Sequence, residues 1–211
     1  MADVATFSVE VEEYAVESLR DCVGGPEWEV QPERAAVLVH DMQPYYLNVL
    51  HNSVRSRVAA EASTVVSRAR AVGMPILASG PRAASAIEQR GLLGPMWGLG
   101  PSAEEVAISE PDFVPIAKRS YSAFYATDLE VELRRRGRDQ LIIVGVFASA
   151  GILATTFDAF ARDIQCFVAI ESTADYTAHQ HRTALNLIRS LTGTVTSSGN
   201  LLHDRHDGPL D

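Results

Sequence analysis

The sequence has 211 residues, of which 46% are hydrophobic and 21% are charged, an ordinary mixture for a globular protein and not for a disordered one. Its length suffices for one α/β domain with a sizeable core, and its formal net charge of −9 argues against a nucleic-acid or anionic-membrane surface, while leaving room for a local basic pocket. No apolar run approaches the ~20 residues of a membrane span, and the start of the sequence lacks the basic and apolar pattern of a signal peptide, so we expect a cytoplasmic protein.

The beginning of the chain differs in composition from the rest. Residues 1–34 are acidic and irregular, with one short helical candidate near residues 11–19. Pro26 and Pro32 interrupt regular structure before the first strong apolar run. We therefore expect an N-terminal arm that packs on the domain or on a second subunit, within a single domain covering residues 1–211.

The chain is organised around the apolar run at residues 35–40, which leads into Asp41 and then Pro44. An apolar run without alternation is typical of a strand buried on both faces, and such strands occur in parallel sheets. Ligands of open α/β sheets bind beyond the carboxyl ends of the strands, so Asp41 is a candidate functional carboxylate. The alternative is that Asp41 caps the next turn or helix, and this stretch alone does not separate the two interpretations.

A helix, a short strand and a long loop follow. Apolar residues at helical spacing predict an amphipathic helix over residues 54–72, and residues 75–79 predict a second strand. Glycines and prolines then break regular structure over residues 80–101, and a loop of this length in a compact domain is usually functional. It carries Arg90 and Trp97, although a solvated loop arginine is the alternative interpretation of Arg90.

The next segment predicts an edge strand and a helix. Residues 113–117 form the strand, in which Pro115 favours an edge position, and Lys118 ends it. A capping-box pattern at residues 127–130 opens a helix that ends in the arginines at 134–136. Acidic residues at the start and basic residues at the end suit the helix dipole, so we interpret the arginine run as a solvated helix end and not as a binding patch.

The strongest predicted strand covers residues 140–146, and the small-residue turn at 147–151 converts it into a helix that ends close to Arg162. Such a turn presents backbone N–H groups to a bound anion. The chain then continues with a strand, a helix and a last strand, at residues 165–170, 178–191 and 194–197. Strands and helices alternate throughout, which predicts an α/β fold with a doubly wound, mainly parallel sheet and helices on both faces.

The cysteines carry no predicted chemistry. Cys22 and Cys166 form neither a metal-ligand spacing nor a disulfide framework. Cys166 lies in the strand predicted at 165–170, so we interpret it as core packing and not as a nucleophile. Because no His, Cys and carboxylate residues stand at ligand spacing, we expect no metal and no cofactor.

Asp41, Lys118 and the turn at 147–151 should meet at one edge of the sheet. This layout resembles that of the isochorismatase-like hydrolases, and it is most similar to the isochorismatases proper, among them phenazine-pathway enzymes that hydrolyse 2-amino-2-deoxyisochorismate. The similarity runs from about residue 33 to 197 in family order and spacing. The matching stretches are residues 40–43, 88–93, 97–98, 118, 121–124, 137–141, 163–165, 181–182 and 184–185.

The resemblance implies roles for individual residues. In this superfamily a cysteine usually opens the helix after the turn and forms a covalent intermediate, whereas Gly151 stands at that position here. Asp41 is the implied general acid, and Lys118 is the second implied catalytic residue, with a share in substrate binding. Gly151 would leave room where a cysteine would crowd the substrate ring or a water. The implied substrate-binding residues are Tyr46, Arg90, Trp97, Phe147 and Gly151.

Further features and differences come from the resemblance. A non-proline cis peptide is implied between Val146 and Phe147, and a homodimer or higher homo-oligomer is implied as the assembly. Phe147 stands where the phenazine enzymes have a tyrosine, and Ser149 stands where they have a histidine. A strand glutamine of those enzymes is replaced by Gly80 or Pro81. The polar contacts to substrate are therefore fewer than in the phenazine enzymes.

The chemistry of the residues agrees with cleavage of an enolpyruvyl ether. One carboxylic acid can protonate the vinyl methylene carbon, water captures the oxocarbenium ion, and the hemiketal collapses to pyruvate and an alcohol, without metal or covalent step. The expected substrate is a small dicarboxylate, isochorismate or its 2-amino-2-deoxy analogue. The alternatives are a non-catalytic binding or scaffold protein on the same fold, and an amidohydrolase in which Ser149 or Cys166 replaces the missing nucleophile. We expect no carrier-protein domain after the hydrolase.

Overall fold

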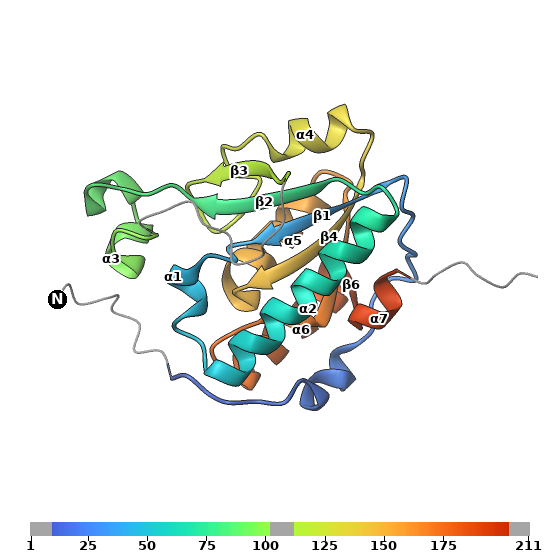
Figure 1. The fold of residues 1–211 in the computed structure, drawn as a ribbon, viewed down its shortest axis with the longest axis horizontal. Coiled ribbons are helices and arrows are strands. Elements are labelled where there is room, and N and C mark those ends of the chain that lie inside the picture. The colour runs from blue at the N-terminus through green and yellow to red at the C-terminus, as the bar shows by residue number, and fades with distance from the viewer. Residues whose placement is uncertain (1–9, 102–111, 203–211) are drawn as a thin grey trace, which may run out of the picture.

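The computed structural model describes residues 10–101 and 112–202 of the chain. Its centre is a six-stranded sheet with the order β3-β2-β1-β4-β5-β6, in which every neighbouring pair of strands is parallel (Figure 1). The doubly wound parallel sheet predicted from the sequence is confirmed. The strands are β1 (Ala35–His40), β2 (Ile76–Pro81), β3 (Val114–Lys118), β4 (Gln140–Val146), β5 (Gln165–Ala174) and β6 (Gly193–Thr196).

Helices cover both faces of the sheet. The long helix α2 (Asn52–Ala71) crosses one face in front of β1, β4 and β5, with α7 (Ser198–Leu201) beside it (Figure 1). The helices α5 (Leu153–Phe160) and α6 (Ala178–Leu191) pack against each other and against β5. None of the helices in the described residues is long and apolar enough to cross a membrane.

The central strands position the functional edge. All residues of β1 and β4 are buried, as the continuous apolar runs predict, because layers lie on both sides of them. Their carboxyl ends, with that of β3, point to the same edge of the sheet. The short helical elements near this edge are α1 (Pro44–Leu47), η2 (Ile87–Arg90), α3 (Leu93–Trp97) and η3 (Ala148–Ile152).

Two local predictions need correction. The helix expected near residues 11–19 is a 3₁₀-helix, η1 (Val16–Cys22), which begins later and buries Leu19 and Cys22 against the core. Only half of the capping box expected at residues 127–130 forms at the start of α4 (Leu129–Arg135), where Thr127 Oγ1 accepts a hydrogen bond of 3.2 Å from the Leu129 N–H. The Glu130 carboxylate binds Arg134 and Arg162, and these charged partners hold it away from the backbone N–H groups of the helix start.

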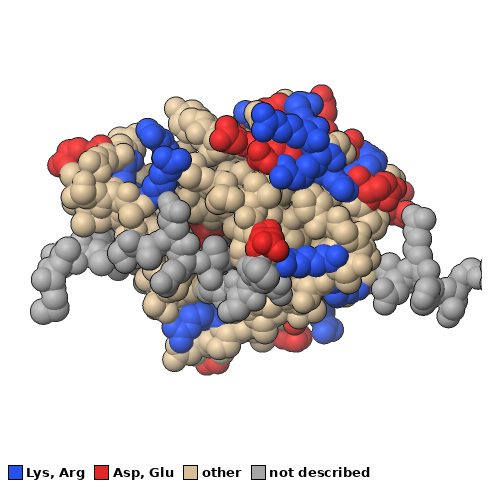
Figure 2. All heavy atoms as spheres, turned by 45° about the horizontal axis from the view of Figure 1, so that its top comes forward, with Lys and Arg blue, Asp and Glu red and all other residues tan. Residues whose placement is uncertain are grey.

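The arginines at the end of α4 lie on an ion-paired surface. Arg134 binds Glu130, and Arg135 and Arg136 bind Glu132. Basic and acidic side chains are accordingly intermingled over this corner of the molecule (Figure 2). The interpretation of this run as a solvated helix end agrees with these contacts.

A buried polar network connects the segment before β1 to the end of β5 and to α6. The Tyr14 hydroxyl oxygen lies 3.1 Å from His181 Nδ1 and accepts a hydrogen bond of 3.1 Å from the Asp175 N–H. His181 Nε2 lies 3.0 Å from Thr173 Oγ1. Burial, and in second place Arg57, lowers the pKa of His181 to about 3, so the ring is neutral in the folded protein near neutral pH.

This buried histidine predicts how stability depends on pH. In the unfolded chain a histidine titrates near 6.5, so below that pH the unfolded state binds a proton that folded His181 refuses until about pH 3. The free energy of unfolding should therefore fall as the pH drops below about 6.5, by up to about 1.4 kcal/mol per pH unit for this group. Chemical denaturation between about pH 7 and pH 5 measures the slope. His181→Asn should remove this group's share of the slope and leave that of His40, whose pKa burial lowers to about 4. His179→Gln, at an exposed position of the same helix, should leave the slope unchanged; equal slopes in both variants would contradict the assignment.

Candidate active site

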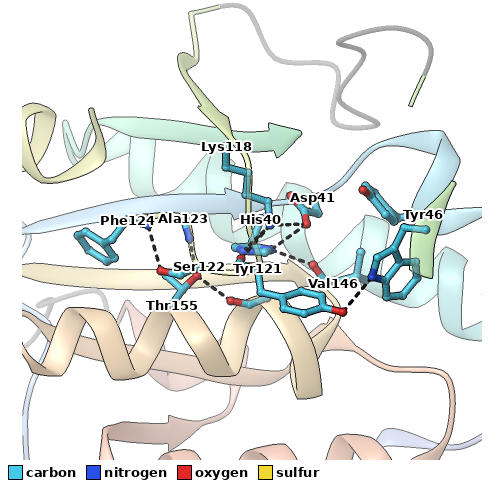
Figure 3. A network of polar contacts seen from close by, with 12 residues as sticks. His40, Asp41, Tyr46, Lys118, Tyr121, Ser122, Ala123, Phe124, Val146 and Thr155 are labelled. Atoms are coloured by element: carbon cyan, nitrogen blue, oxygen red, sulfur yellow. Dashed lines mark hydrogen bonds and ion pairs between the residues drawn. The ribbon is translucent and has the colours of Figure 1, made fainter. Parts of the chain in front are cut away.

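A buried ion pair stands at the carboxyl edge of the sheet. Lys118 Nζ, at the end of β3, lies 2.7 Å from Asp41 Oδ2, directly after β1 (Figure 3). Asp41 is 8% exposed and Lys118 is 3% exposed. The strand between them, β2, ends in Gly80 and Pro81. The structure therefore brings together two of the strand ends that the sequence expects to meet.

The backbone of Asp41 adopts an unusual conformation. Its φ of 52° lies in the left-handed region, which residues other than glycine seldom adopt. This breaks the alternation of a regular strand, and Asp41 Oδ2 lies only 3.7 Å from Nδ1 of His40. The next helix, α1, has Gln43 at its N-cap position and no side-chain cap, so the capping interpretation of Asp41 is wrong. Asp41 Oδ1 is buried and has no hydrogen-bond partner among the described residues.

Lys118 is surrounded by acceptors. Its Nζ lies 2.7 Å from Asp41 Oδ2, donates to the Tyr121 carbonyl oxygen at 2.9 Å and lies 3.4 Å from His40 Nε2 (Figure 3). An ammonium group has three hydrogens, so these three acceptors use all of them. Burial lowers the pKa of Lys118, and the neighbouring Asp41 carboxylate opposes that shift. The amine is therefore better placed to exchange a proton with Asp41 than to hold a carboxylate of a ligand.

His40 is a site residue that the sequence analysis did not single out. Its ring is fully buried, with Nδ1 2.9 Å from the Val146 carbonyl oxygen. A carbonyl can only accept, so Nδ1 carries the hydrogen and Nε2 is left as the acceptor facing Lys118. Burial first, and then the positive charge of Lys118, lowers the pKa of His40 to about 4, so the ring is neutral near neutral pH. A histidine at the end of a wholly apolar run, directly before Asp41, was the signal in the sequence.

The turn after β4 supplies the floor of the site. The peptide bond between Val146 and Phe147 is cis, as the resemblance implies, and a turn of π-helix, η3, follows. Gly151 lies in η3, and a Cβ added there would stand 2.2 Å from Cε1 of His40. The space expected to be free for the substrate ring or a water is therefore occupied by the imidazole.

Arg90 is a buried cation at the end of η2. It is 9% exposed, so the alternative of a solvated loop arginine is wrong. Its Nη1 donates to the carbonyl oxygens of Trp97 at 3.2 Å and Gly98 at 2.9 Å, and its Nη2 donates to the Tyr46 hydroxyl at 3.4 Å. No carboxylate of the described residues lies within ion-pairing distance of it. Its positive charge thus remains available to an anion.

Aromatic rings form the wall of the site. Phe147 stacks on Tyr176 at a centroid distance of 4.2 Å and on Trp97 at 5.8 Å. Tyr46 meets Trp97 and Phe147 edge to face. Tyr176, which follows the end of β5, was missed because its place depends on stacking with Phe147 and Trp97 from distant segments and not on a local motif.

The seven residues that the sequence points to line one cavity. The set consists of Asp41, Tyr46, Arg90, Trp97, Lys118, Phe147 and Gly151. Its inner volume is only about 20 Å³, and it adjoins an outer basin of about 420 Å³ that shares Arg90 and Lys118 with it. Arg82 and Arg119 line the outer basin, so an acidic protein presents a basic entrance to its site. Such an entrance attracts an anionic ligand.

The candidate replacements for a nucleophile lie elsewhere. Cys166 is fully buried in the middle of the sheet, and burial raises the pKa of its thiol. The Ser149 N–H donates to Asp175 Oδ2 at 2.6 Å, and Ser149 is exposed to solvent. Neither residue lines the inner cavity. The geometry gives no support to an amidohydrolase with a serine or cysteine nucleophile.

The chain is similar to known proteins over most of its length. Residues 35–199 match the family described as the isochorismatase domain. A probable isochorismatase from Pseudomonas chlororaphis is 36% identical over 193 residues, covering 88% of this chain and 93% of that protein. The phenazine biosynthesis protein PhzD1 of Pseudomonas aeruginosa is 37% identical over 183 residues, covering 83% and 88%. A solved cysteine hydrolase from Pseudomonas syringae has a TM-score of 0.71 at 23% identity, covering 82% and 92%, and shares the fold.

Proposed function

Because the chain belongs to the isochorismatase family of hydrolases, we propose that it removes the enolpyruvyl group, as pyruvate, from isochorismate or 2-amino-2-deoxyisochorismate. The second product is a trans-dihydrodiol acid or trans-2,3-dihydro-3-hydroxyanthranilate. The observation that carries this proposal is a buried Asp41 that is hydrogen-bonded by Lys118 at a cavity with a glycine at the usual position of a nucleophile. The names of the phenazine relatives support the class of substrate.

Asp41 delivers the proton in the proposed reaction. Lys118 passes a proton to the Asp41 carboxylate, which leaves a neutral amine and a neutral acid. Burial promotes this transfer, because a site that excludes water disfavours charged groups. The acid then protonates the vinyl methylene carbon, whose π electrons form the new C–H bond, and an oxocarbenium ion results. Water adds to this ion and returns a proton to the Asp41 carboxylate, after which the hemiketal collapses to pyruvate and the alcohol.

Binding of the substrate uses the remaining cations. Arg90 holds one carboxylate, because Lys118 has no free hydrogen, and the basic basin with Arg82 and Arg119 receives the other. The inner cavity is far smaller than the several hundred Å³ of a usual ligand site. The aromatic wall at Trp97 must therefore move outward when the ring of the substrate enters. The proposed chemistry calls for no metal and no cofactor.

Pyruvate release tests the proposal directly. The purified protein is incubated with each of the two compounds, and pyruvate is followed by coupled reduction to lactate. Turnover of either compound supports the vinyl ether hydrolase. If both compounds bind and neither releases pyruvate, the non-catalytic binding protein replaces this proposal.

The substitution of Phe147 by tyrosine should raise activity. The hydroxyl that this position lacks, relative to the phenazine enzymes, would add a hydrogen bond to a polar group of the substrate. Such a bond to a charged group contributes about 1.5–3 kcal/mol, so kcat/KM should rise by about tenfold or more. Steady-state kinetics of Phe147→Tyr on both compounds measures the effect, and Phe160→Tyr, at an exposed position of α5, is the matched control. Equal kcat/KM in wild type and Phe147→Tyr on one compound would mean that the pocket already suits that compound.

A further inference from the structure

The His40 imidazole and the missing side chain of Gly151 fit together as a pair. A Cβ at residue 151 would lie 2.2 Å from His40 Cε1 and 2.9 Å from Nε2, both too close for any real contact. Neither the buried ring, which is tied to the Val146 carbonyl, nor the backbone of η3 between β4 and α5 can move away easily. The chain can therefore hold a side chain at position 151 or this ring at position 40, but not both.

The His40 ring also lies against Lys118 and Asp41, but it does not line the inner cavity. Its Nε2 is one of the three acceptors around Lys118, at 3.4 Å, while its Nδ1–H is held by Val146. His40 is not among the residues that line the inner cavity. A histidine that met the substrate would line that cavity, so its contacts indicate a role through Lys118.

We propose that His40 is a positioning residue, whose neutral ring fills the volume left by Gly151 and holds the Lys118 amine against Asp41. Gly151 then serves the reaction by making room for this ring, which is a different role from making room for the substrate. The kinetic part of this inference rests on the proposed function, whereas the packing and the placement of Lys118 do not.

The packing pair is tested by thermal unfolding of Gly151→Ala in two backgrounds. In wild type the added methyl group should lower Tm by about 4–10 °C, the usual effect of overpacking in a chain of this size. In His40→Ala the same substitution should lower Tm much less, because the ring is gone and only the Tyr121 carbonyl oxygen, 3.1 Å from the added Cβ, remains close. Gly199→Ala, where a Cβ meets nothing closer than 3.9 Å, is the control. If Gly151→Ala lowers Tm equally in both backgrounds, His40 and Gly151 are not packed as proposed. The same conclusion follows if His40→Ala folds and the double variant does not.

The placement of Lys118 is tested by its own reactivity, which needs no substrate. Lys118 is the only lysine of the sequence, so an amine reagent modifies this side chain and the N-terminus alone. His40→Asn keeps a donor near Nδ1 and loses the acceptor, whereas His40→Gln keeps an acceptor near Nε2. Reductive methylation, read by peptide mass spectrometry, should be severalfold faster at Lys118 in His40→Asn and close to wild type in His40→Gln. Equal rates in all three proteins would overturn the proposal.

Kinetics separate positioning from binding. His40→Asn should lower kcat by about tenfold and leave KM within about twofold, and His40→Gln should restore most of kcat. A rise in KM alone would place His40 in substrate binding and contradict the inference. If wild type releases no pyruvate, the proposed function fails, and the methylation and unfolding experiments still decide the role of His40.

Discussion

Asp41→Asn should reduce pyruvate release by a factor of about 10²–10⁴, the usual contribution of a general acid, and to background if no other acid can replace it. The amide has the shape of the carboxyl group and cannot deliver a proton. Its oxygen can still accept from Lys118, so the fold should be retained. The inner cavity contains no second carboxylate among its lining residues, which is why a large effect is expected.

The measurement is kcat on isochorismate and on its 2-amino-2-deoxy analogue, together with the affinity for each compound. Affinity should change little, since Arg90 remains in place. Asp139→Asn is the matched control, because Asp139 pairs with Arg34 at the surface, far from the carboxyl edge. A kcat of Asp41→Asn near that of wild type would disprove the general-acid mechanism.

Lys118→Met should impair both stability and turnover. It removes the partner of a buried carboxylate, and breaking one half of such a pair typically costs about 3–5 kcal/mol of folding free energy. It also removes the proposed source of the proton, so kcat should fall by at least about 100-fold. Denaturant unfolding and pyruvate release measure the two effects.

The double variant distinguishes the two effects. Asp41→Asn in the Lys118→Met background removes the unpaired charge, so it should recover a large part of the lost stability. It should recover none of the activity. If stability is not recovered, the Asp41–Lys118 contact is not the ion pair described above, and if activity returns, neither residue handles the proton.

The general position of the site can be predicted from the sequence because parallel strands end at a common edge. Asp41 and Lys118 each follow a short strand pattern, so their meeting at this edge follows from topology without any knowledge of distances. Arg90 could be placed in a functional loop for another reason, because glycines and prolines break regular structure over residues 80–101. Its burial could not, because it depends on how the carbonyl oxygens of Trp97 and Gly98 fold back onto its guanidinium.

The contacts inside the site could not be predicted. The three acceptors around Lys118 come from the end of β1 and the loop after β3, and no periodicity in the sequence records their separation. His40 was missed because one polar residue in an apolar run does not alter the strand pattern. The Glu130 half of the capping box failed for a related reason, since Arg162, which follows α5, binds the Glu130 carboxylate. In each case a contact between distant segments overrides the local pattern.

The match to the family begins at residue 35, yet the packed core begins earlier. Tyr14 and Leu19 belong to the same buried cluster as the sheet, and the Glu12 N–H donates at 2.9 Å to the carbonyl oxygen of Tyr176, whose ring backs Phe147. The aromatic wall is thus supported from behind by a segment that precedes residues 35–199, the stretch matched by the family model. Substitutions in this leading segment can therefore change the shape of the pocket from its outer side, while every residue that takes part in the reaction stays the same.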